Sequence, residues 1–195
     1  MRLTPEQERE IAQMMSGEIY DATDNTALLE LRDNCQNLCY DYNRLRPTDL
    51  AGRDALIRRI LGRTGKRLQV IQPFICDYGF NIEVGENFFA NTNLVILDEA
   101  KVTFGDNVFI APNCAFYTAC HPVEAGPRNG GQQYSLPITV GNDVWIGGNV
   151  VVLAGVTIGD RCVVGAGSVV TRDLPPDSLA VGNPCRVVRK INNKV

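Results

Sequence analysis

Residues 140–170 read VGNDVWIGGNVVVLAGVTIGDRCVVGAGSVV, and an apolar residue returns at every sixth position of this stretch. The six lead positions are Val140, Ile146, Val152, Ile158, Val164 and Val170. Small or apolar residues also stand four positions after the first five leads, at Val144, Val150, Val156, Cys162 and Ser168. An α-helix repeats every 3.6 residues and an amphipathic strand every two, so neither explains a period of six. The period predicts a mainly β protein built as a parallel β-helix, in which three hexads make one triangular coil.

Glycine follows the lead residue in four of these hexads, at Gly141, Gly147, Gly159 and Gly165. We expect the lead side chains to point into the prism. We expect the glycines to permit tight corners with unusual backbone dihedrals, which side chains with a Cβ disfavour. Stacked coils should repeat at the strand spacing of about 4.8 Å.

The same period continues toward the N-terminus with one shift of phase. Its leads are Val84, Ala90 and Ile96 and then, two residues out of phase, Phe104, Ile110 and Phe116. A gap separates Phe116 from Val140, and continued hexads would bury Pro122, Arg128 and Tyr134 there. We therefore expect a loop at about 119–137 to leave the prism wall, and such long loops usually carry function. Residues 68–83 are predicted to form an irregular first coil.

Three amphipathic helices are predicted before the repeats. The first begins at a capping box of Thr4 and Gln7, the second runs from Asn25 to Asn43, and the third from Thr48 to about Leu61. These residues are too few to bury a core alone, so we expect them to pack on the first coil or on a neighbouring subunit. The predicted units are a helical cap at 1–62, the β-helix at 63–180 and a tail at 181–195.

Composition excludes several classes of function. The chain has 195 residues and a net charge of -3, so no general electrostatic attraction to nucleic acid or to an anionic membrane is expected. No apolar run approaches the ~20 residues that span a bilayer, and the N-terminus does not resemble a signal peptide. The seven cysteines contain no CxxC pair. We expect them to be reduced and the protein to be cytoplasmic.

The chain contains one histidine, His121, at the start of the expected loop. A lone histidine is usually a surface or hydrogen-bonding residue. Where a rigid wall leads into a protruding loop, however, a side chain is well placed for catalysis. Neutral imidazole also suits proton transfer near neutral pH. We therefore predict that His121 is a general base.

Several longer motifs carry a family resemblance that covers nearly the whole chain. They are SGEIYDATD (16–24), GDNVFIAPNCAFYTACHP (105–122), ITVGNDVWIGGNVVVLAGVTIGD (138–160), GAGSVVTRDLPP (165–176) and GNPCRVV (182–188). Together with the hexads, they resemble the maltose/galactoside O-acetyltransferases, a family of left-handed β-helix acyltransferases. The handedness is implied by the family alone, because crossovers between parallel strands are ordinarily right-handed.

The resemblance implies transfer of an acetyl group from acetyl-CoA to a sugar hydroxyl. It also implies a homotrimer with active sites between subunits, and no metal. His121 matches the family's base, and Asn91 matches a position that contacts the sugar and the reacting centre. The family transfers the group directly, which disfavours Cys120 as a nucleophile beside His121.

The remaining site residues also follow from the resemblance. Asp77 and Glu99 match positions used for sugar hydroxyls, and Asp98 is either a partner of the imidazole or sugar or a simple coil corner. Tyr20 and Asp21 are looser candidates for the acceptor site. Acetyl-CoA is expected along the coils at Trp145, Gly148, Ala166, Thr171, Arg172 and Arg189, with less support for Lys190. Of these, the single Trp145 is expected to face outward and the arginines to meet CoA phosphates.

Three other functions were weighed. A zinc carbonic anhydrase needs three imidazoles per site, which one histidine per chain does not supply away from a threefold axis. A non-catalytic scaffold is disfavoured by the position of His121, the matched arginines and the single tryptophan. Acetyl transfer to an antibiotic, an oligosaccharide signal or a polysaccharide stays open, because such enzymes share the same wall and base.

Overall fold

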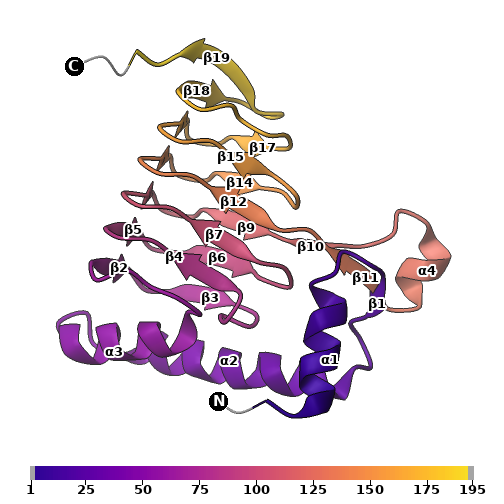
Figure 1. Ribbon diagram of the computed structural model, residues 1–195. Coiled ribbons are helices and arrows are strands. Elements are labelled where there is room, and N and C mark those ends of the chain that lie inside the picture. The colour runs from indigo at the N-terminus through magenta and orange to yellow at the C-terminus, as the bar shows by residue number, and fades with distance from the viewer. Residues whose placement is uncertain (1–2, 193–195) are drawn as a thin grey trace.

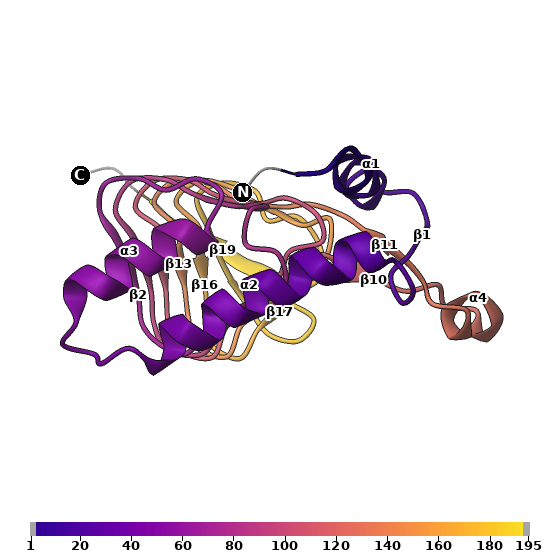
Figure 2. The same cartoon turned by 90° about the horizontal axis from the view of Figure 1, so that it is seen from below.

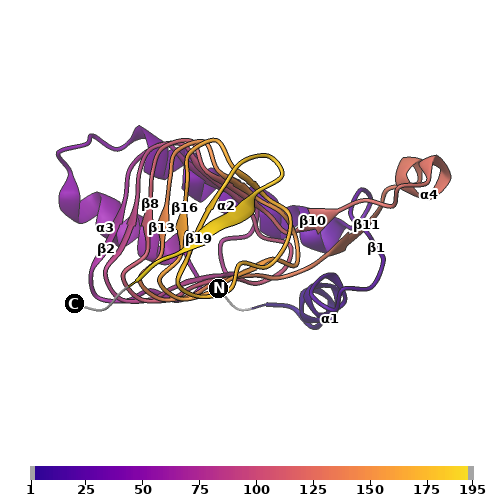
Figure 3. The same cartoon turned by 90° about the horizontal axis from the view of Figure 1, so that it is seen from above.

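Parallel strands wind through three walls to form a left-handed β-helix, which stands on a helical cap (Figure 1). The arrangement is that of a computed structural model, which describes residues 3–192. The cap and tail expected from the sequence also include residues 1–2 and 193–195, which lie outside the described residues. Seen along the axis, successive coils lie over one another (Figures 2 and 3).

Each wall is one sheet of the described chain. The four-stranded wall contains β4 (Ile82–Val84), β7 (Val102–Phe104), β12 (Ile138–Val140) and β15 (Thr157–Ile158). The seven-stranded wall contains β2 (Leu68–Val70), β5 (Phe88–Ala90), β8 (Phe109–Ile110), β13 (Trp145–Ile146), β16 (Val163–Val164), β18 (Ser178–Val181) and, antiparallel to β18, β19 (Arg186–Lys190). The five-stranded wall contains β3 (Phe74–Cys76), β6 (Leu94–Leu97), β9 (Ala115–Tyr117), β14 (Val151–Val152) and β17 (Val169–Val170).

The lead residues form the core of the prism, as predicted. In the four-stranded wall, the register places Val84, Phe104, Val140 and Ile158 above one another. All six leads of the 140–170 stretch are at most 1% exposed. The rings of Phe104 and Phe116 meet edge to face with centroids 5.0 Å apart. One continuous apolar column therefore replaces a two-sheet core, because every wall directs its buried side chains to the same axis.

The glycines after the leads serve a purpose different from the predicted one. None of Gly141, Gly147, Gly159 and Gly165 has a positive φ; the left-handed residues come two positions later, as at Asp143 (φ 57°) and Asn149 (φ 58°). A Cβ on Gly147 would lie 2.6 Å from the backbone N of Ala166 in the next coil. The expectation of unusual dihedrals was wrong, because these positions need glycine for close approach between coils rather than for backbone freedom.

The cap packs on the first coil, one of the two arrangements expected. It contains α1 (Pro5–Met14), α2 (Thr26–Arg44) and α3 (Leu50–Ile60). Thr4 and Gln7 form the predicted capping box. Tyr42 Oη donates to the Val70 carbonyl at 2.6 Å, and the Asn43 side chain pairs with the backbone of Phe74. These bonds fix α2 across the base of the prism (Figure 2).

Two segments differ in detail from the expectation. Residues 68–83 are more regular than predicted, because β2 and β3 pair in parallel with β5 and β6 of the next coil. The 119–137 loop is a structured arm that leaves the prism (Figure 1): β10 (Ala119–Cys120) and β11 (Gln132–Ser135) form a hairpin with α4 (Ala125–Asn129) at its tip. Within residues 3–192, no helix combines the length and apolarity that a bilayer span requires.

Candidate active site at the base of the arm

His121 lies at the base of the arm, directly after β10. Its imidazole is exposed, and Nδ1 lies 3.2 Å from the Gln132 carbonyl oxygen on the facing strand. A carbonyl oxygen only accepts hydrogen bonds, so this contact assigns the hydrogen to Nδ1. This contact leaves Nε2 as the nitrogen whose lone pair, in the neutral ring, can act as a general base.

Asp98 lies at the corner where the five-stranded wall turns into the four-stranded wall. Its Oδ1 accepts hydrogen bonds from the backbone N–H groups of Asp77 (3.0 Å) and Tyr78 (2.9 Å). The side chain is fully buried, and burial raises its pKa to about 7. Of the two roles left open by the sequence, the structure shows the coil corner. Asp98 does not reach the surface of the chain and instead fixes the backbone that carries Asp77.

Glu99 lies at the same corner and faces Asp77. It is 6% exposed, and Thr118 Oγ1 donates to its Oε2 at 3.3 Å. Burial, together with a hydrogen bond to Asp77 and the negative charge of that residue, raises the pKa of Glu99 to about 8. Asp77 and Glu99 therefore form one acid–carboxylate pair, which offers both a hydrogen-bond donor and acceptors to a polyhydroxyl ligand.

Tyrosine and glutamine side chains extend this corner toward the arm. Gln133 Nε2 donates to Tyr20 Oη at 2.5 Å, because β1 (Tyr20–Asp21) pairs antiparallel with β11. Burial and the nearby Glu99 charge raise the pKa of both Tyr20 and Tyr78. The sequence indicated Tyr20 as a looser candidate but not Tyr78, Thr118 or Gln133. Neither the pairing of residue 20 with residue 133 nor the burial of Thr118, two positions after the lead Phe116, has a signal in the hexad pattern.

Asn91 does not lie with His121 in the single chain. It follows β5, at the edge between the seven-stranded and five-stranded walls, whereas His121 lies beyond the opposite edge of the five-stranded wall. Figure 1 shows β5 and β10 on opposite sides of the prism. Asn91 is half-buried, and its Oδ1 accepts from the Thr92 N–H at 2.8 Å, which leaves its Nδ2 group as an available donor.

The expected cofactor residues also divide between these two edges. Gly148 and Ala166 stack on the edge that carries Asn91, and the Gly167 N–H donates to the Gly148 carbonyl. Trp145 stands beside them on β13 and is 56% exposed, which confirms its outward direction. Thr171 and Arg172 follow β17 on the other edge, and Arg189 lies on β19 opposite Leu179. All three are exposed.

Two walls carry apolar side chains on their outer faces. In the seven-stranded wall, the outward row in register is Phe89, Phe109, Trp145, Val163 and Leu179. In the five-stranded wall it is Ile75, Val95, Ala115, Val151 and Val169. The four-stranded wall instead presents Glu83, Thr103, Thr139 and Thr157. Apolar rows of this length mark contact surfaces in proteins that otherwise expose polar side chains.

Comparison with known proteins identifies closely similar chains. The family model for the maltose acetyltransferase hexapeptide capping motif matches residues 13–65, and that for the bacterial transferase hexapeptide (six repeats) matches 137–172. Galactoside O-acetyltransferase of Escherichia coli is 47% identical over 167 residues, which cover 86% of this chain and 82% of the relative.

Two solved structures have the same fold. A maltose O-acetyltransferase from Clostridium difficile superposes with a TM-score of 0.92 and 46% identity, covering 98% of this chain and 100% of the other. A galactoside acetyltransferase in complex with coenzyme A gives 0.90 and 43%, covering 97% and 92%. Both alignments include the cap as well as the prism.

Proposed function

The chain belongs to the family of maltose and galactoside O-acetyltransferases, and we propose that it moves an acetyl group from acetyl-CoA to a hydroxyl of a sugar. The observation that carries the proposal is the contact of His121 Nδ1 with the Gln132 carbonyl at the base of the arm, which leaves Nε2 to act as the base. The resemblance of the chain to a galactoside acetyltransferase bound to coenzyme A supports the donor.

His121 Nε2 removes the proton of the sugar hydroxyl while its oxygen attacks the thioester carbonyl carbon. The C–S bond then breaks, the acetyl group stays on the sugar oxygen, and the leaving thiolate of CoA takes the proton from the imidazolium. The base ends the cycle neutral, and no covalent enzyme intermediate forms. General-base catalysis of this kind contributes about 10²–10⁴-fold to the rate.

We place each active site between two subunits of a homotrimer. His121 and Asn91 lie at different edges of one chain, so one site contains both only where the edges of two chains meet. The cofactor residues divide in the same way, with Gly148 and Ala166 at one edge and Thr171 and Arg172 at the other. The apolar rows of the five- and seven-stranded walls supply the surface that such an assembly buries.

In this arrangement, the acid–carboxylate pair of Asp77 and Glu99 binds sugar hydroxyls, and Asp98 acts through the Asp77 backbone. Asn91 Nδ2 holds the attacking hydroxyl or the carbonyl oxygen. Trp145 packs against the pantetheine arm, and the charges of Arg172 and Arg189 bind CoA phosphates. The seven free cysteines support a reducing, cytoplasmic location.

The test is a mass-spectrometric screen that incubates the protein with acetyl-CoA and a panel of glucosides, galactosides, maltose, chitin oligomers and amines. We expect acetylated sugar from the wild type and a loss of about 10²–10⁴-fold in His121→Ala. Val123→Ala, on the same arm and 87% exposed, is the matched control. If amines are acetylated and sugars are not, the proposed acceptor class is wrong and the acceptor is an amine. Absence of both products and of acetyl-CoA binding would refute the enzyme assignment.

A further inference from the structure

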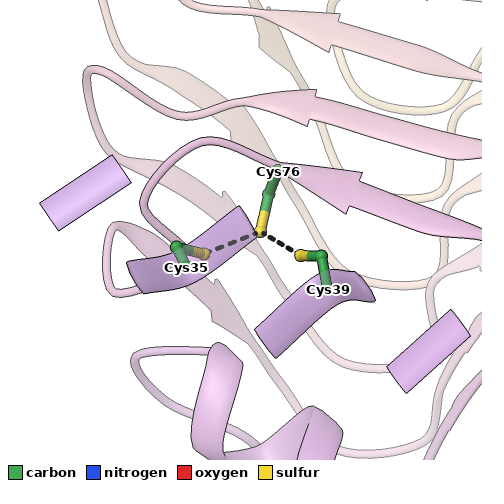
Figure 4. A group of neighbouring side chains, drawn as sticks. All are labelled: Cys35, Cys39 and Cys76. Atoms are coloured by element: carbon green, nitrogen blue, oxygen red, sulfur yellow. Dashed lines mark hydrogen bonds between the residues drawn. The ribbon is translucent and has the colours of Figure 1, made fainter. Parts of the chain in front are cut away.

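Three buried cysteines meet where the cap joins the prism. Cys35 and Cys39 lie one turn apart on α2, and Cys76 ends β3. Figure 4 shows the three sulfur atoms pointing toward one another. Cys76 Sγ lies 3.6 Å from Cys35 Sγ and 3.7 Å from Cys39 Sγ, and all three sulfurs lie within 4.8 Å of one another. Their separation in sequence hid this cluster from the sequence analysis.

The sulfur spacing matches a metal site rather than a covalent pair. A disulfide requires an S–S distance of about 2.05 Å, well below either contact. A metal ion bonded to three thiolates at about 2.3 Å holds them about 4 Å apart. Small side-chain rotations bring the cluster to that geometry, because Cys35 and Cys39 already share one face of a helix.

Thiolate is the form of cysteine that binds metals. Binding of an ion therefore displaces protons from the thiols of the cluster.

A cleft beside α2 borders the cluster. It is lined by Leu3, Asn34, Cys35, Leu38, Arg59, Ile60, Tyr78 and Phe80. Of the three cysteines, Cys35 forms part of this lining and is 4% exposed.

The donor set selects the class of ion. Among residues 3–192, the group within 4.8 Å contains these three sulfurs and no further histidine, cysteine or carboxylate ligand. Structural zinc sites are almost always four-coordinate, whereas soft sulfur ligands favour monovalent copper, which accepts three-coordination. We propose that Cys35, Cys39 and Cys76 bind one monovalent copper ion in a trigonal thiolate site.

Binding would join the cap to the first coil, independently of acetyl transfer. The ion links two residues of α2 to the end of β3 and displaces thiol protons to solvent. Asp77 follows Cys76 directly, so the site also fixes the strand end that carries an acceptor residue. A failure of the copper site leaves the proposed reaction unaffected, because neither His121 nor the cofactor edges take part in it.

The experiment is an anaerobic titration of the full-length protein with Cu(I) against bicinchoninate, with ascorbate in place of a thiol reductant. We expect one tightly held ion per chain and an X-ray absorption spectrum with three sulfur neighbours at about 2.3 Å. Cys76→Ser and, separately, Cys39→Ser should each lose the ion. Cys120→Ser, a half-buried cysteine on the arm, should retain it.

Three outcomes would overturn the proposal. The first is transfer of all copper to the chelator by the wild type. The second is retention of one ion per chain by both folded cluster variants, with folding verified by circular dichroism. The third is tighter binding of Zn(II) than Cu(I) with four ligands in the absorption spectrum, which would assign a different ion and geometry.

Discussion

Thr118 Oγ1 donates a hydrogen bond to Glu99 Oε2 across two successive coils, at 3.3 Å and out of contact with solvent. The same hydroxyl hydrogen is shared with the nearer Leu97 carbonyl at 2.7 Å, so Thr118 connects the corner before the arm to the corner below it. Glu99 is thereby held beside Asp77 in a buried position. Its protonation state then depends on pH in a range that is accessible to experiment.

We predict that Glu99→Gln flattens the pH dependence of stability. The folded-state pKa of Glu99 is about 8, above its ordinary value of 4.5. The contribution of this group to stability is therefore fully present below pH 4.5, declines as the pH rises and is lost above about pH 8. Within that window one such group changes the free energy of unfolding by about 1.4 kcal/mol per pH unit. Glutamine stays neutral at every pH, so the variant lacks this pH-dependent contribution to the free energy of unfolding.

Urea unfolding at pH 5.5, 7 and 8.5 measures the effect. The wild type should lose stability toward pH 8.5 more steeply than Glu99→Gln, and the exposed Glu18→Gln should follow the wild type. Coincident profiles of the wild type and Glu99→Gln would show that Glu99 is ionised in the folded protein throughout.

Gly147→Ala should destabilise the prism. The added Cβ would lie 2.6 Å from the Ala166 backbone N, a contact that forces two coils apart. Overpacking of this kind costs about 1–3 kcal/mol. Gly126→Ala on the arm is the control, because a Cβ there meets nothing within 4 Å. Thermal unfolding should therefore separate the two variants, and equal midpoints would contradict the role assigned to coil spacing.

Much of the fold could be predicted from the sequence, because each coil repeats one local rule. The lead residues and the residues four positions later both point inward, so a period of six fixes the walls and the core. The physical role of the glycines could not be predicted. Gly147 is needed because a Cβ there would clash with Ala166, and that close approach depends on how the coils stack. A turn residue such as Asn149 adopts positive φ instead, a conformation that asparagine tolerates.

The candidate site was predicted less completely. His121 and Trp145 could be singled out as candidates because each is the single residue of its type in a marked position. Contacts between distant segments gave no such signal: the Gln133–Tyr20 hydrogen bond joins residues 113 positions apart. In the proposed trimer, the edge that brings Asn91 to His121 belongs to another chain, so the pair could not be recognised from contacts within one chain.

Phe109→Glu should weaken the assembly. Phe109 is 43% exposed and lies in register with Trp145 on the apolar outer row of the seven-stranded wall. A buried carboxylate in a subunit contact is costly unless it is paired. Light scattering after gel filtration should give three times the chain mass of 21.4 kDa for the wild type and a smaller species for the variant. Thr139→Glu, on the polar four-stranded wall, should remain trimeric; a monomeric wild type would refute the shared site.

Mixing two inactive variants tests whether sites are shared. His121→Ala retains Asn91, and Asn91→Ala retains His121, so neither homotrimer contains a complete site. Refolding equal amounts together yields mixed trimers in which one of three interfaces joins an intact His121 to an intact Asn91. Random assembly should therefore restore about a quarter of the wild-type activity. Mixing the variants without refolding is the control and should stay near background. If refolded mixtures also stay at background while each variant binds acetyl-CoA and forms trimers, the two residues act within one chain or in separate steps, and the inter-subunit site is wrong.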